Sequence, residues 1–140
     1  MLEIRLANNQ ELDTIDKFLN ENDQKHRKSD KLNYMVAYEN EKIVGALIFQ
    51  KEEDTAIINY IIVREDKRNQ YIGEGLLKAM LSYSEHEGMT KAIVSTSESG
   101  GFFRKNGFVD RVNENLQKTI LEVILPDYFL TSCKSCGVIK

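Results

Sequence analysis

Alternating or mostly apolar segments predict the strands of this chain. Alternation places every second side chain on one face of a sheet, and β-branched apolar runs suit more deeply buried strands. The expected strands cover residues 2–6, 34–39, 43–51, 55–63, 91–96 and 108–112, with a hairpin turn over 39–42. Residues 119–125 are also predicted to be a strand, although Leu116, Ile120 and Ile124 fit one face of a helix as well.

Apolar residues at helical spacing predict two longer helices. These two are expected over residues 9–22 and 72–87. A short helix is expected over 98–106, and a loop or short helix over 24–32. Asn8 or Asn9 caps the first helix, and Gly88 ends the second. The apolar face of the first helix is formed by Leu12, Ile15, Phe18 and Leu19. The elements therefore follow the order β-α-(α)-β-β-β-α-β-α-β-β.

Length and charge narrow the class of protein. The 140 residues predict one domain over 1–140, in which 126–140 form a C-terminal tail with two cysteines. A formal net charge of −3 argues against sequence-independent nucleic-acid binding, which needs a basic surface. No apolar run has membrane-spanning length, and the N-terminus does not resemble a signal peptide. We therefore expect a cytoplasmic protein that binds neither nucleic acid nor membrane.

The two cysteines of the tail, Cys133 and Cys136, are spaced as C-x-x-C. Such a pair is found in redox sites and as half of a zinc site. A redox pair normally begins a helix after a strand, and a zinc site needs two further ligands. We favour a reduced thiol pair without a metal, and a homodimer in which two chains share one zinc ion is the alternative.

The strand over 55–63 leads through a polar turn directly into the helix that begins at Ile72. Arg68, Gly73 and Gly75 lie at this junction. The first amides of a helix have no partner within it and, together with the helix dipole, bind anions. Glycine lets a ligand approach the backbone closely, and arginine offers a planar fork of donors to phosphate oxygens. The junction is therefore predicted to bind phosphate.

The segment Arg68-Asn69-Gln70-Tyr71-Ile72-Gly73 resembles the acyl-CoA signature R-x-x-G-x-G/A of the GNAT superfamily of N-acetyltransferases. Tyr71 stands where the first glycine is usual, and its side chain is expected to reshape the pyrophosphate loop or weaken cofactor binding. The resemblance implies that acetyl-CoA contacts Ile61, Ile62, Val63, Arg68, Asn69, Gln70, Tyr71, Ile72, Gly73, Glu74, Gly75, Thr96 and Phe103.

The resemblance covers residues 1–125 and implies an α/β (α+β) fold. Its central sheet is expected to be mixed and mostly antiparallel, with helices on its flanks. The parallel strands that contain Ile62 and Thr96 are expected to splay apart and expose backbone groups to the pantetheine arm.

Residues 99–108 resemble a second GNAT motif, in which two aromatic residues precede a Lys and a Gly-Phe. The second aromatic is commonly a tyrosine that protonates the departing thiolate. Here it is Phe103, which has no proton to give. Core packing is the favoured interpretation of Phe102 and Phe108. The Phe-Phe form and the cysteine tail are similar to the N-acetylglutamate-synthase-like subgroup, which suggests an amino acid as acceptor.

The family reaction, attack of an amine on a thioester, implies two catalytic groups. The backbone N–H of Ile62 or Val63, with Val63 preferred, is the expected donor to the thioester oxygen. A base is also needed, and Glu98, Glu53, Asp54 and His26 are candidates by proximity in the sequence. Surface exposure is the simpler interpretation of each, as aromatic packing is for Tyr34 and Tyr60. The basic segment 25–28 is either a charged loop or a site for an anionic acceptor.

These observations predict an acetyl-CoA-dependent N-acetyltransferase that acts on a primary amine of a small molecule or amino acid. The alternative is an acyl-CoA-binding module with weak or no transferase activity. Tyr71, Phe103 and the lack of an obvious base motivate that alternative.

Overall fold

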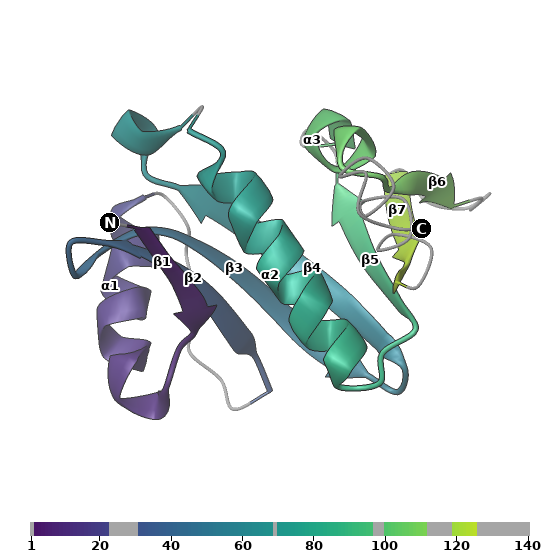
Figure 1. Ribbon diagram of the computed structural model, residues 1–140, viewed down its shortest axis with the longest axis horizontal. Helices are drawn as coiled ribbons and strands as arrows, with labels where there is room; N and C mark the ends of the chain where they lie inside the picture. The colour runs from purple at the N-terminus through teal and green to yellow at the C-terminus, as the bar shows by residue number, and fades with distance from the viewer. Residues whose placement is uncertain (1, 23–30, 69, 97–99, 112–118, 126–140) are drawn as a thin grey trace, which may run out of the picture.

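The computed structural model describes residues 2–22, 31–68, 70–96, 100–111 and 119–125. Seven strands form one sheet in the spatial order β1-β2-β3-β4-β5-β7-β6 (Figure 1). The strands are β1 (Leu2–Leu6), β2 (Asn33–Glu39), β3 (Lys42–Glu52), β4 (Thr55–Val63), β5 (Lys91–Thr96), β6 (Val109–Arg111) and β7 (Thr119–Ile124). The helices are α1 (Leu12–Glu21), α2 (Ile72–His86) and α3 (Gly100–Lys105), with 3₁₀ turns η1 (Asn9–Glu11) and η2 (Glu65–Lys67).

The predicted sheet is confirmed: β4 and β5 are parallel and every other neighbouring pair is antiparallel. The expected turn between β2 and β3 places Asn40 and Glu41 at φ of 51° and 70°. Two consecutive positive φ angles are typical of a two-residue hairpin turn that matches strand twist. Residues 119–124 form a strand rather than a helix, and β7 lies between β5 and β6. The expected element over 24–32 lies mostly outside the described residues.

The first helix begins differently from its prediction. Asn8 is the expected cap, because its side chain accepts a hydrogen bond from the Gln10 amide at 3.0 Å. The Glu11 carboxylate accepts a bond from the Asn8 amide at 3.0 Å and completes a capping box. The first turn is a 3₁₀ turn, and the α-helix begins only at Leu12.

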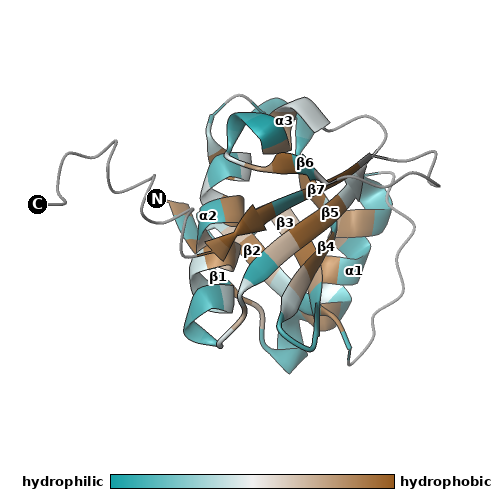
Figure 2. Ribbon diagram, turned by 90° about the vertical axis from the view of Figure 1, so that its right-hand side faces the viewer, coloured by the Kyte–Doolittle hydropathy of each residue, from teal (hydrophilic) through white to brown (hydrophobic). Residues whose placement is uncertain are grey.

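Helices cover both faces of the sheet, and each face has its own core. Figure 2 shows α1 and α2 on opposite sides of the strands, with apolar residues concentrated between them. On one side α2 and α3 pack over a core that contains Leu76, Leu77, Phe103 and Phe108. On the other side α1 packs over Ile48 and its neighbours. No helix in the described part of the chain is long and apolar enough to cross a membrane.

Candidate active site at the end of β4 and the start of α2

A bulge in β4 marks the point where the sheet opens. In the register between β3 and β4, Ile48 lies opposite Tyr60 and Phe49 lies opposite Ile58, so Asn59 has no partner on β3. Such a bulge bends its strand. The ladder between β4 and β5 ends at the pair Ile58 and Val94, and the remaining residues of β5 pair only with β7. The expected separation of the two parallel strands is therefore confirmed.

The backbone of β4 beyond the bulge turns polar groups toward this gap. The Arg64 amide donates to the Val44 carbonyl at 2.8 Å, which makes Val63 and Gly45 a pair without hydrogen bonds between them. The N–H and C=O groups of Val63 therefore face away from β3, as do those of Ile61 two residues earlier. The backbone of Ile62 bonds to β3 instead. Of the two expected oxyanion donors, this geometry leaves the Val63 amide available and occupies that of Ile62.

The start of α2 adds further amides to the same place. The first hydrogen bond of the helix runs from the Gly75 amide to the Tyr71 carbonyl at 3.0 Å. The amides of Ile72, Gly73 and Glu74 precede it, have no backbone partner among the described residues, and receive no side-chain cap. Arg68 is held beside them, because its Nε donates to the Val63 carbonyl at 3.0 Å.

These groups share one open groove of about 370 Å³. The groove is lined by Val63, Lys67, Arg68, Tyr71, Ile72, Gly73, Glu74, Phe102 and Lys105, and a neighbouring apolar recess adds Ile61. Lys67 forms an ion pair with Glu39 at 2.5 Å, and Lys105 lies 3.7 Å from Glu74. The groove thus combines apolar side chains, the unpaired amides, the Arg68 guanidinium, and two lysines that are each beside a carboxylate, of which Glu74 also lines the groove. This combination suits an elongated ligand with phosphate groups.

The two glycines of the motif have different surroundings. A Cβ atom added to Gly73 would lie 3.5 Å from the Phe102 ring, inside the groove. A Cβ atom added to Gly75 would lie 2.8 Å from Ile4 Cδ1, on the side where α2 packs against β1. The Gly75 amide is also already bonded within the helix. Gly75 therefore serves helix packing. Its predicted contact with the cofactor stays a prediction, although its amide is bonded within the helix and a Cβ there would face Ile4.

The two aromatic residues of the second motif differ in burial. Phe103, expected at the cofactor, is 2% exposed and packs against Phe108 with ring centroids 5.3 Å apart. Phe102, expected in the core, is half-buried: it packs against the same core and also lines the groove. Neighbouring residues on a helix point about 100° apart, so only one of the two can face the groove. The prediction for Phe108, which is buried, is confirmed.

The remaining predicted residues are dispersed. Gln70 is exposed beside Tyr71, and Thr96 ends β5 at the gap. Asn69, Glu98, His26, the basic segment 25–28 and the cysteine pair lie outside the described residues.

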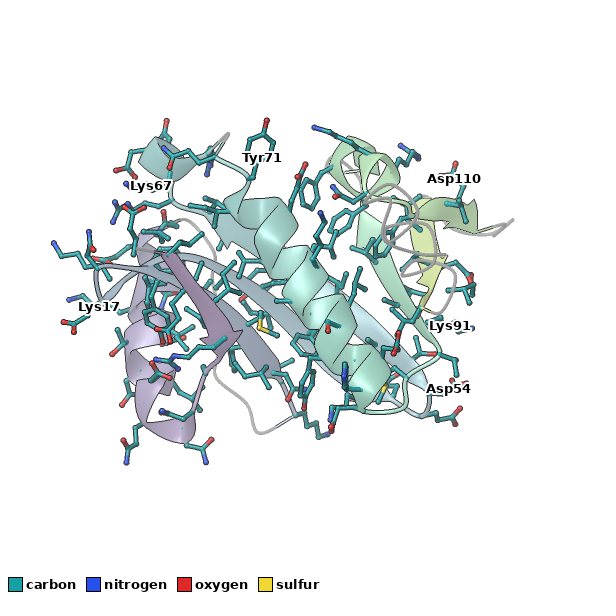
Figure 3. All side chains as sticks on the ribbon, in the orientation of Figure 1. Lys17, Asp54, Lys67, Tyr71, Lys91 and Asp110 are labelled. Atoms are coloured by element: carbon teal, nitrogen blue, oxygen red, sulfur yellow. The ribbon has the colours of Figure 1, made fainter. Side chains whose placement is uncertain are left out.

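Two base candidates, Glu53 and Asp54, lie in the turn between β3 and β4. The nine residues of β4 separate them from Val63 by about 26 Å, and Figure 3 shows Asp54 and Tyr71 at opposite ends of the molecule. Thr90 donates a hydrogen bond of 3.0 Å to the Asp54 carboxylate, which lowers the pKa of Asp54. Both residues are exposed, as the simpler interpretation expected.

The face of β4 under α1 holds polar groups that sequence reasoning missed. Tyr34, Ile48 and Tyr60 occupy one row across β2, β3 and β4. Burial, together with the nearby Tyr34 and Asp16, raises the pKa of Tyr60 to about 12. Asp16 Oδ1 is buried and has no hydrogen-bond partner among the described residues. The sequence signals the burial of Asp16 only by its spacing: Asp16 follows Leu12 by four residues and so lies on the inner side of the helix.

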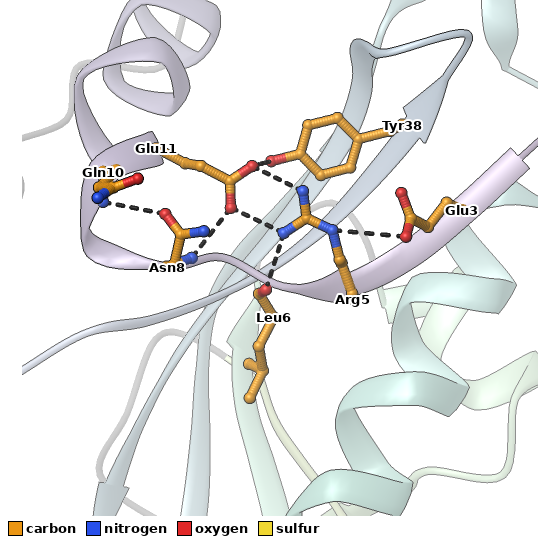
Figure 4. Close-up of polar contacts among 7 residues, drawn as sticks. All are labelled: Glu3, Arg5, Leu6, Asn8, Gln10, Glu11 and Tyr38. Carbon is orange, nitrogen blue, oxygen red and sulfur yellow. Dashed lines mark hydrogen bonds and ion pairs between the residues drawn. The ribbon is translucent and has the colours of Figure 1, made fainter.

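A second polar cluster, at the β1 edge of the sheet, has its charges paired internally (Figure 4). Arg5 donates two hydrogen bonds to the Glu11 carboxylate, at 2.7 and 2.8 Å, and its guanidinium lies 4.5 Å from the centre of the Tyr38 ring. The Tyr38 hydroxyl donates to the same carboxylate. The bonds from Arg5 lower the pKa of Glu11 to about 2. This cluster joins β1, β2 and η1 and is complete without a ligand.

The chain is similar in sequence to a known family of acetyltransferases. The acetyltransferase (GNAT) domain model matches residues 30–110. No curated protein matches the chain at a significant level of similarity.

Solved acetyltransferases share the fold. N-acetylglutamate synthase from Neisseria gonorrhoeae, complexed with coenzyme A and N-acetyl-glutamate, aligns with 89% of this chain at 17% identity and a TM-score of 0.73. This chain spans only 35% of that protein. The ribosomal-protein-S18-alanine N-acetyltransferase from Escherichia coli aligns with 89% of this chain and 94% of its own length, at 16% identity and a TM-score of 0.69.

PaiA N-acetyltransferase from Thermoplasma acidophilum, in complex with coenzyme A, aligns with 89% of this chain and 99% of its own length. The identity is 12% and the TM-score is 0.71. Identities this low show a common fold and say nothing about the acceptor. The family match extends over more than half of the 140 residues and includes both β4 and α2. On this evidence the chain belongs to the GNAT family of acetyltransferases.

Proposed function

We propose that this chain transfers an acetyl group from acetyl-CoA to a primary amine of a small molecule, by direct attack of the amine on the thioester. The observation that carries the proposal is the meeting, in one groove, of two sets of backbone groups that have no partner in a neighbouring strand or helix turn. Ile61 and Val63 turn theirs into the gap beside β5, and the first amides of α2 open at its edge. Two of the similar structures contain coenzyme A, which supports the same ligand here.

The cofactor uses the two sets of groups differently. The pyrophosphate binds to the amides of Ile72, Gly73 and Glu74, where the helix dipole also favours negative charge. Arg68 supplies a further charged donor, since its Nε bond to the Val63 carbonyl holds the side chain at the groove. The pantetheine amides pair with the exposed backbone groups of Ile61, in place of a neighbouring strand. Acetyl-CoA is thereby fixed at both ends of its pantetheine arm.

The reaction needs one donor and one neutral amine. The Val63 amide donates to the thioester oxygen as that oxygen gains charge. The amine nitrogen forms a bond to the acetyl carbon and the carbon–sulfur bond breaks. The nitrogen gives up one proton as it becomes an amide, and the departing CoA thiolate takes up one proton. The amine must first lose its own proton, because an alkylammonium has a pKa near 10.4 and no lone pair for attack.

The acceptor reaches the thioester from the α1 side of the sheet, because the cofactor fills the side of α2 and α3. Asp16 is the group on that side with an unsatisfied buried oxygen, which suits the ammonium of an incoming amine. Tyr60 keeps its proton at neutral pH, since its pKa is raised to about 12, and acts as a hydrogen-bond donor rather than as a base. An amino acid is the first acceptor class to test.

The alternative, an acyl-CoA-binding module with little turnover, shares the groove but not the chemistry. Phe103 is in the core and has no proton to give. A transfer assay distinguishes an acetyltransferase from an acyl-CoA-binding module.

In that assay, the protein is incubated with acetyl-CoA and a panel of primary amines, amino acids first. Release of the CoA thiol and the mass of the acetylated product are measured. Transfer predicts amine-dependent thiol release with one N-acetylated product. Binding of acetyl-CoA without thiol release above the amine-free rate would favour the binding module.

A further inference from the structure

Tyr71 is the least expected residue of the groove. Its backbone has φ of 64° and ψ of 14°, the left-handed conformation, which is unusual for a bulky side chain. Its side chain is 75% exposed and makes no capping hydrogen bond to α2. A glycine would adopt the same backbone without strain and without exposing an apolar ring. The packing of the fold therefore gives no reason for a tyrosine at this position.

The exposed ring does not block the groove. Figure 3 shows the Tyr71 side chain extending from the start of α2 away from the body of the molecule. Tyr71 nevertheless lines the groove together with the first residues of α2. The expectation that a side chain here closes the pyrophosphate loop therefore finds no support in the ring's position. The ring stands as a flat surface immediately outside the unpaired amides.

The charges around Tyr71 fit the part of the cofactor that lies beyond the pyrophosphate. Lys67 and Arg68 line the groove from the turn before α2, and Lys105 lines it from the end of α3. The Lys105 side chain is 73% exposed. An aromatic face between cations is the arrangement that binds a base and its phosphates without reading the sequence of a nucleic acid. Coenzyme A carries both groups on one adenosine.

We propose that Tyr71 stacks on the adenine of coenzyme A, and that this contact makes the protein select donors that carry the nucleotide over donors that carry phosphopantetheine alone. The proposal rests on the proposed function, since it takes the pyrophosphate to lie on the first amides of α2. Base stacking does not require the tyrosine hydroxyl, so phenylalanine is expected to replace Tyr71.

The test is calorimetric titration of the full chain and its variants with coenzyme A and with 4′-phosphopantetheine. Removing a stacked aromatic ring weakens binding by roughly 5- to 150-fold. Tyr71→Ala is therefore expected to weaken coenzyme A by that factor and to leave 4′-phosphopantetheine unchanged, while Tyr71→Phe keeps the affinity for both. Glu53→Ala is the matched control, because Glu53 is also exposed and left-handed, with φ of 55°, but lies at the far end of β4.

Two results would overturn the stacking role. Tyr71→Ala with unchanged affinity for coenzyme A would show that the ring makes no useful contact. Equal losses for coenzyme A and 4′-phosphopantetheine would show that the substitution disturbs the backbone cradle instead. Failure of the proposed function is recognised separately: absence of an acetyl-CoA site would leave the unaltered protein binding neither compound and would overturn the stacking proposal, whereas absence of transfer alone would appear only in the transfer assay.

Discussion

The β1 edge of the sheet and the start of α2 are both rich in polar groups. Only at the β1 edge do these groups form hydrogen bonds with one another. At the edge, Arg5, Glu11 and Tyr38 are joined to one another by hydrogen bonds and a cation–ring contact. At the start of α2, the amides of Ile72 and Gly73 have no backbone partner among the described residues. Polar groups that bond to one another stabilise the fold, whereas groups left unpaired at a groove favour a ligand.

This contrast makes a crossed prediction. Substitutions in the edge cluster should change stability and leave cofactor binding intact, and substitutions in the groove should do the reverse. Three variants, at Gly73, Glu11 and Tyr71, test the contrast, and a fourth, at Asp16, tests the α1 side of the sheet. They follow from the largest expected effect.

Gly73→Val should abolish most cofactor binding. The new side chain would begin 3.5 Å from the Phe102 ring and occupy the space between α2 and the end of β4. We expect the affinity for acetyl-CoA to fall by about 100-fold or more, which corresponds to about 2.8 kcal/mol. Stability should change little, because valine is the better helix former of the two. Calorimetric titration and urea unfolding measure the two quantities.

Gly101→Val is the control for this substitution. Gly101 lies in α3, and a Cβ atom there would meet nothing within 4 Å. Its affinity for acetyl-CoA should equal that of the unaltered protein. An equal loss of affinity for acetyl-CoA in both variants would show that the loss in Gly73→Val does not come from filling the groove.

Glu11→Gln should lower the free energy of unfolding by about 1–3 kcal/mol at pH 7, because it removes the charged acceptor shared by Arg5 and Tyr38. The affinity for acetyl-CoA should not change. Urea unfolding and calorimetric titration provide the two readouts. The contrast between the two regions would be contradicted if the variant were as stable as the unaltered protein. It would also be contradicted if the variant folded normally but no longer bound acetyl-CoA.

The effect of Glu11→Gln should also depend on pH. The pKa of Glu11 is about 2 in the folded protein, whereas its ordinary value is 4.5. Folding therefore favours the charged form of the carboxylate over the protonated form. The stabilisation is therefore complete above about pH 4.5 and is lost as pH falls toward 2. The difference between the unaltered protein and the variant should be constant from pH 7 to 5 and smaller at pH 3. A difference that grows on acidification would contradict this sign.

Asp16→Ala should stabilise the fold, since it removes the buried carboxylate oxygen without a described partner. The expected gain is about 1 kcal/mol beyond that of Asn20→Ala, an exposed site on the same helix with a similar gain in helix propensity. In the transfer assay, Asp16→Ala should raise the KM for the amine and leave the affinity for acetyl-CoA unchanged. A loss of stability would show that Asp16 has a structural partner instead.

Tyr71→Gly should have the smallest effect on stability. Relief of the left-handed strain favours the variant by about 1–2 kcal/mol, and the greater freedom of glycine in the unfolded chain offsets about 0.5–1 kcal/mol of that gain. Glu53→Gly should show the same small net gain, because its backbone is similar. The two variants should differ only when acetyl-CoA is present, since Tyr71 lies at the groove and Glu53 does not. Thermal unfolding with and without the cofactor measures this difference.

The parts of the fold that depend on local sequence were predictable. The apolar run of β4 followed by Arg68 and Gly73 predicted a strand, a turn and a helix in the right places, and phosphate binding at that turn stays a prediction. The strand period of residues 119–125 also outweighed the competing helical pattern, because the segment pairs with both β5 and β6.

The features that depend on packing were not predictable. Nothing in the order Phe102-Phe103 states which ring faces the groove, because that depends on how the short α3 rests on the sheet. Gly75 matches a binding motif, yet its contact with Ile4 arises only once α2 lies across β1. Asp16 comes near Tyr60 because α1 crosses the strands, and residues 44 positions apart carry no local signal of that contact.

The central claim is that the start of α2 and the end of β4 form an acetyl-CoA site. Thermal unfolding of the unaltered protein and of Gly73→Val, each with acetyl-CoA, coenzyme A or ATP, tests it most directly. At 100 times its dissociation constant, acetyl-CoA should add about 2.7 kcal/mol of stability to the unaltered protein. ATP, which has no pantetheine arm, should add much less than acetyl-CoA, and Gly73→Val should gain far less from acetyl-CoA. No shift at millimolar acetyl-CoA, or an equal shift in Gly73→Val, would contradict the claim.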